Sequence, residues 1–154
     1  GYNLQLHENL VLGLWDNARM QGEVAGSNMA GVESRYGGNI IHNITHFFDT
    51  DFVGIGDIRR TGEHISTGTF ADDNYIEAVI DGDTLCSMNL LGTPRISGVF
   101  NNYFKKRMLL PDAAFSNEQM GVLTRYGVER SFLDIIANTK HITGGDAAWN
   151  ARSN

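Results

Sequence analysis

The sequence predicts an α+β domain, in which an antiparallel β-meander of about five strands follows N-terminal helices and a long C-terminal helix packs on one face. Three observations support this prediction. β-branched and aromatic residues recur with a period near two in the centre of the chain, and apolar residues follow helical spacing on both flanks. The connections between the central runs are too short for helical crossovers, so neighbouring strands are expected to be antiparallel.

The N-terminal third has apolar residues at helical spacing, with Leu10, Leu14 and Ala18 four residues apart. Four glycines, at positions 13, 22, 26 and 31, each disfavour a helix by up to about 1 kcal/mol relative to alanine. Helices are therefore the first interpretation of residues 8–36, and a strand over Val11–Trp15 is the alternative.

After Gly37-Gly38, the segment Asn39–Phe48 is predicted to form a short helix, because its isoleucines and phenylalanines gather on one side. The period then changes to two. The predicted strands are Phe52–Arg59, His64–Phe70, Tyr75–Asp81, Thr84–Leu90 and Arg95–Phe100. Asp81-Gly82 between two of these runs is the clearest hairpin signal in the chain.

The C-terminal third is predicted to be helical. A short helix over Asn101–Leu110 ends before Pro111, because the residue before a proline disfavours the helical conformation. A long amphipathic helix follows, with Ser116 as its N-cap and Gln119 in the capping-box position. The residues 1–154 are expected to form a single domain with a polar tail from about residue 143.

The charge excludes some classes of partner. The chain has 12 basic and 18 acidic residues, a formal net charge of −6 and a pI near 5.2. Its one strong basic cluster is Lys105-Lys106-Arg107, which is too small for a surface that follows a phosphate backbone. No apolar run approaches the roughly 18 residues of a membrane helix. We therefore expect neither nucleic acid nor membrane as a partner.

Cysteine usage bears on the cellular compartment. Cys86 is the one cysteine, so a disulfide framework and a cysteine-based zinc site are both excluded. No signal peptide is visible near Gly1. These features fit a reducing compartment or a virion, and the sequence does not identify the compartment.

Two histidines and an aspartate form the strongest candidate metal site. On the predicted helix, His42 and His46 are four residues apart and lie on one face, and Asp49 follows three residues later. Two imidazoles and a carboxylate can hold zinc or ferrous iron and leave coordination positions open for a substrate. The alternative is that these side chains form a solvated helix face.

One segment resembles a known family. The sheet followed by Ala114–Gln119 and the long apolar helix looks like the closing part of sensory domains of the GAF and PAS type. This resemblance implies a domain that binds a small molecule between its sheet and its helices, and it identifies no binding residues.

The composition favours a self-associating module. Charged residues make up 19 % of the chain, and much of its polarity comes from 18 glycines and 14 asparagines, against a typical charged fraction of about 25 %. We expect a structural or assembly protein, such as a virion, tail or shell component, that forms a homo-oligomer or binds a structural partner without a cofactor. The alternatives are a GAF/PAS-like small-molecule sensor and a small enzyme that uses a divalent metal at His42, His46 and Asp49.

Overall fold

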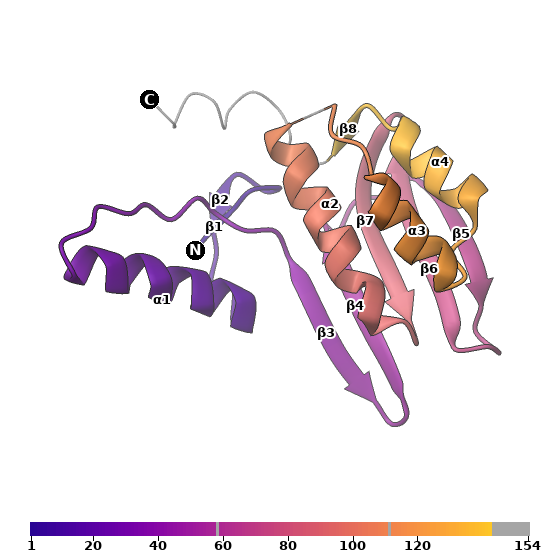
Figure 1. The fold of residues 1–154 in the computed structure, drawn as a ribbon, viewed down its shortest axis with the longest axis horizontal. Coiled ribbons are helices and arrows are strands. Elements are labelled where there is room, and N and C mark those ends of the chain that lie inside the picture. The colour runs from indigo at the N-terminus through magenta and orange to yellow at the C-terminus, as the bar shows by residue number, and fades with distance from the viewer. Residues whose placement is uncertain (58, 111, 143–154) are drawn as a thin grey trace.

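The computed structural model describes residues 1–57, 59–110 and 112–142. Its main part has two layers, an antiparallel sheet and a layer of helices that covers one face of the sheet (Figure 1). The elements are β1 (Tyr2–Asn3), β2 (Glu8–Asn9), α1 (Trp15–Met29), β3 (His42–Phe47), β4 (Thr50–Gly56), β5 (Glu63–Thr69), β6 (Asn74–Asp81), β7 (Thr84–Leu91), η1 (Pro94–Ile96), α2 (Ser97–Leu109), α3 (Asn117–Arg125), α4 (Arg130–Asn138) and β8 (His141–Ile142).

The predicted α+β class is confirmed, but the strand order differs from a simple meander. The strands lie in the order β3-β4-β7-β6-β5, and β8 pairs in parallel with the start of β7. Strands β5, β6 and β7 are consecutive neighbours, and Asp81 pairs with Thr84 across the predicted hairpin. Strand β4 pairs with β7 rather than with β5, so the β3–β4 hairpin and the three-stranded β5–β6–β7 unit are joined through strands that are distant in sequence.

In two segments the observed conformation is the reverse of the predicted one: a predicted helix is a strand, and a predicted strand is helical. The segment predicted as a helix at Asn39–Phe48 contains β3, which forms a hairpin with β4 from the pair His42 and Ile55 to the pair Phe47 and Thr50. The run predicted as a strand at Arg95–Phe100 is instead helical, because Pro94 opens η1 and the chain continues directly into α2. Both runs are short and apolar, and their period alone does not separate helix from strand.

The predicted long C-terminal helix is two helices. The capping box is confirmed, since Gln119 N donates to Ser116 Oγ at 3.1 Å and Ser116 N donates to Gln119 Oε1 at 2.8 Å. However, α3 ends at Arg125, and Gly127 has a φ of +85°. This conformation favours glycine and cannot continue a right-handed helix. The predicted tail from about residue 143 lies outside the described residues.

The N-terminal third contains one helix, α1, and Val11–Leu14 precede it as irregular chain. Figure 1 shows α1 near the start of β3, extending away from the layer of α2, α3 and α4, and the Asp16–Lys105 ion pair joins its first turn to α2. None of the described helices is both long and apolar enough to span a membrane.

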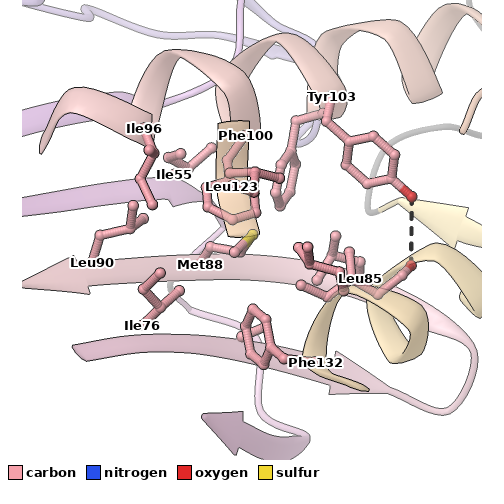
Figure 2. Close-up of a cluster of buried hydrophobic side chains, with 14 of the residues drawn as sticks. Ile55, Ile76, Leu85, Met88, Leu90, Ile96, Phe100, Tyr103, Leu123 and Phe132 are labelled. Carbon is pink, nitrogen blue, oxygen red and sulfur yellow. Dashed lines mark hydrogen bonds between the residues drawn. The ribbon is translucent and has the colours of Figure 1, made fainter. Parts of the chain in front are cut away.

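The core lies between the sheet and the layer of α2, α3 and α4, as Figure 2 shows. Its fully buried side chains come from β4, β6 and β7 on one side and from the helices on the other: Val53, Ile55, Ile76, Ala78, Met88, Leu90, Phe100, Phe104, Leu123 and Leu133. Because strand side chains alternate, residues such as Gly54, Glu77 and Asn89 point to the opposite face, which these helices leave uncovered.

A buried cation links α2 to the end of α4. The Arg107 side chain donates to the Tyr103 hydroxyl at 3.0 Å and to the Thr139 carbonyl at 2.6 Å. Tyr103 in turn donates to the Ile136 carbonyl at 3.5 Å, the bond drawn as a dashed line in Figure 2. Burial raises the pKa of the Tyr103 hydroxyl, with a smaller opposing effect from Arg107. The hydroxyl therefore stays protonated and can both accept and donate.

The substitution Phe100→Ala is expected to lower the free energy of unfolding by about 3–5 kcal/mol, because it removes a fully buried ring at the centre of the core. Urea unfolding followed by circular dichroism measures this change. Lys106→Ala, at an exposed position of the same helix, is the control and should change stability by less than about 0.5 kcal/mol. Similar losses for both variants would contradict the description of the core.

Candidate functional site

His42 is half-buried on β3 and faces the helical layer. Its Nδ1 atom lies 3.1 Å from Asn101 Nδ2 on α2, and its Nε2 atom is buried without a hydrogen-bond partner in the described part of the chain. Burial lowers the pKa of His42, while Asp16 raises it and Lys105 lowers it by smaller amounts. His42 is therefore a neutral histidine with one unused ring nitrogen.

The other two predicted metal ligands lie at the far end of the β3–β4 hairpin. His46 is directly opposite Asp51, and its Nδ1 atom contacts the Asp51 carboxylate. Asp49 is exposed in the connecting turn and lines a hollow of about 390 Å³ with Asp51, Asp73 and Arg95. The hairpin thus brings His46 to an aspartate that the sequence analysis did not select.

The strand conformation separates the two histidines. Four residues span about 13 Å of extended chain, whereas they span about 6 Å along a helix. No three His, Cys, Asp or Glu side chains among residues 1–57, 59–110 and 112–142 are arranged to hold a metal ion. Metal binding by His42, His46 and Asp49 remains a prediction, and its original basis in helical spacing is wrong.

Polar contacts rather than apolar packing hold α1 in place. Asn17 is its one buried residue; Asn17 Nδ2 donates to the Leu12 carbonyl at 3.1 Å, and Asn17 Oδ1 accepts from the Tyr36 hydroxyl. Asp16 forms an ion pair with Lys105 of α2 at 3.5 Å. No residue of α1 belongs to the core described above.

The opposite side of α1 is apolar and exposed. It carries two large side chains, with exposed fractions of 77 % and 89 % at Trp15 and Met29, and small residues between them at helical spacing. We call this set the α1 stripe, and it consists of Trp15, Ala18, Gly22, Ala25, Gly26 and Met29, all exposed. An amphipathic helix normally turns such a stripe toward the core, so its exposure identifies a surface that another structure can cover.

The stripe continues beyond both ends of the helix. Val11 before α1 and Val32 after it are exposed by 101 % and 62 %. In the sequence, the helical spacing of Ala18, Gly22 and Gly26 was the available signal for this surface. It was missed because the glycines were interpreted only as residues that weaken a helix.

Comparisons with protein-family models and with characterised protein sequences found no match. Among solved structures, a crystal structure of NADH:rubredoxin oxidoreductase from Clostridium acetobutylicum is similar to part of this chain, with a TM-score of 0.44 and 22 % sequence identity. The similar region covers 58 % of this chain and 24 % of that chain. Similarity at this level defines neither the fold nor the activity of this protein.

His42 should make stability depend on pH. Its folded-state pKa lies below its ordinary value, so below about pH 6.5 the unfolded chain binds this proton more readily than the folded chain does. The contribution of neutral His42 to the free energy of unfolding is fully present above the ordinary histidine pKa. It is lost as the pH falls through the lower folded-state pKa. Urea unfolding at pH 7.5 and 5.5 should show a smaller difference in stability for His42→Gln than for the wild type.

His141→Gln, at an exposed position, is the matched control and should keep the wild-type pH dependence. If His42→Gln also keeps the full pH dependence, the burial of His42 does not have the energetic effect described above.

Proposed function

We propose that this chain is an association module and that a second copy of the chain covers its α1 stripe. The observation that supports this proposal is the exposure of the whole apolar side of a 15-residue helix. Leaving such a surface in water has a free-energy cost of about 25 cal/mol for each Å² of apolar area, and association removes that cost.

The sequence of α1 favours a second copy as the occupant, because Trp15 and Met29, and also Ala18 and Gly26, are placed symmetrically about Gly22. Trp15 and Met29 lie at the two ends of α1, and each is seven residues from Gly22. In an antiparallel pair with a two-fold axis at Gly22, Trp15 of each copy packs against Met29 of the other. This self-complementary pattern is what a two-fold interface requires.

The small residues and the low charge of the α1 stripe allow two copies of α1 to pack closely at this two-fold axis. A Cβ atom added at Gly22 or at Gly26 would have no other atom within 4 Å, so a second helix can approach the α1 backbone there. The charged residues Arg19 and Glu23 pair with each other beside the stripe. The apolar stripe therefore presents no unpaired charge that association would have to bury.

Sedimentation equilibrium of the wild type and of Gly22→Glu tests the proposal. The wild type should dimerise reversibly in the micromolar range, and Gly22→Glu should raise the dimer dissociation constant at least about tenfold, since the two-fold axis brings the two new carboxylates together. The substitution itself should be tolerated, because glutamate has a higher helix propensity than glycine.

Gly121→Glu is the matched control, because Gly121 is exposed on α3 and a Cβ atom there would also have no neighbour within 4 Å. It adds the same charge and should leave the dissociation constant unchanged. A wild type that stays monomeric at millimolar concentration, or equal effects of the two variants, would contradict self-association through α1. The sensor and metal-enzyme alternatives remain predictions.

A further inference from the structure

The uncovered face of the sheet carries a cavity of about 570 Å³. On the sheet, Gly54 of β4 lies in its floor beside the apolar Phe52 and Ile41, and the segment Val11–Leu14 lines it from outside the sheet. The volume is within the range of small-molecule sites, which is about 300–1,000 Å³. The cavity lies on the sheet face opposite α2, α3 and α4, where the resemblance to sensory domains did not place a ligand.

A row of aligned residues crosses the sheet at this cavity. The strand pairing places Asn43, Gly54, Asn89, Glu77 and Ser66 side by side on β3, β4, β7, β6 and β5. Asn43 and Asn89 also line the cavity. The missing side chain at Gly54 therefore leaves a gap between two amide groups.

The orientation of the Asn89 amide follows from its neighbour. Asn89 Nδ2 lies 3.3 Å from Glu77 Oε1, and a carboxylate can only accept hydrogen bonds. The amide nitrogen must face Glu77, and the amide oxygen must face away from it. Asn89 Oδ1 indeed lies 3.8 Å from the position of a Cβ atom built at Gly54. A hydrogen-bond acceptor is thus directed over the cavity floor.

The Glu77 carboxyl is ionised, and in this form it holds the Asn89 amide in the orientation described. Burial raises the pKa of the Glu77 carboxyl, but hydrogen bonds from His64, Asn89 and Tyr75 together lower it below its ordinary value. His64 Nδ1 lies 3.3 Å and the Tyr75 hydroxyl 3.2 Å from Glu77 Oε2. The negative charge beside Asn89 disfavours an anionic ligand in the cavity.

The segment over the cavity is held by several contacts. Gly1 and Leu10 exchange hydrogen bonds of 2.6 and 2.8 Å at one end of this segment. Near the other end, Asn17 binds the Leu12 carbonyl, and the Asp16–Lys105 ion pair joins the start of α1 to α2. The cavity is therefore formed before any ligand enters, which lowers the entropic cost of binding.

The geometry points to a binding site in this cavity for a small, flat, uncharged aromatic molecule with an N–H group that donates to Asn89 Oδ1. Glycines in the floor and in the covering segment, Gly54 and Gly13, expose flat peptide surfaces to such a ring. Phe52 and the aliphatic walls provide apolar contact, and the amide oxygen selects for a donor. The site does not depend on association through α1.

Titration of the ¹⁵N-labelled full chain with indole tests this inference, with benzofuran as a probe of the same shape that lacks the N–H donor. Indole should shift the Gly54 amide and the Asn89 side-chain amide resonances. Its dissociation constant should be about tenfold lower than that of benzofuran, because only indole pairs with the acceptor at the floor. Equal affinity for the two probes, or shifts confined to other residues, would overturn the assignment.

Gly54→Val fills the floor of the cavity and should weaken indole binding at least about tenfold. A Cβ atom at Gly54 would meet its nearest neighbours, Phe52 Cε1 and Asn89 Oδ1, at 3.6 and 3.8 Å, which are ordinary contact distances. Gly54→Ala adds a smaller side chain and should weaken indole binding less. It provides the test if the valine variant does not fold.

Ser66→Val is the matched control for these variants. It adds the same side chain to the same row of the sheet at an exposed position of β5, away from the cavity. This variant should bind indole as the wild type does. Undiminished binding by both Gly54 variants, or equal losses in Gly54→Val and Ser66→Val, would overturn the proposed site.

Discussion

The packing of α2 across β4 and β7 is the interaction on which the rest of this structure depends. Phe100 and Phe104 are fully buried against the alternate residues of these strands, including Ile55 and Met88. Because strand side chains alternate, the residues of β4 and β7 that do not face α2 point to the other face of the sheet. The same packing thus produces both the hydrophobic core and the uncovered face on which the Gly54 cavity lies.

Two surface features meet at the segment Val11–Leu14. This segment lies over the cavity and leads directly into α1, whose apolar stripe faces solvent. No residue of this segment or of α1 belongs to the described core cluster, and α1 is held by Asn17 and by the Asp16–Lys105 ion pair. The Asp16–Lys105 ion pair is partly exposed, and such pairs are individually weak, whereas Asn17 is buried.

Prediction from the sequence succeeded where a short stretch of chain contains its own structural signal. Ser116 and Gln119 form the predicted capping box, and the turn after Asp81 forms the predicted hairpin. It failed where local signals are ambiguous. The apolar run containing Ile44 fits a helix as well as a strand, and pairing with β4 selects the strand. This error also removed the helical basis for grouping His42, His46 and Asp49, since strand geometry places the two histidines far apart.

The sequence by itself determined the α+β class, four of the central strands and the ends of several elements, because propensity, capping and turn chemistry act over a few residues. Only the tertiary structure decided that β4 lies beside β7, and therefore that Gly54 lies between Asn43 and Asn89. It also decided that the apolar side of α1 faces outward. Both outcomes depend on contacts between residues distant in sequence, and the periodicity of a single segment does not identify its partner.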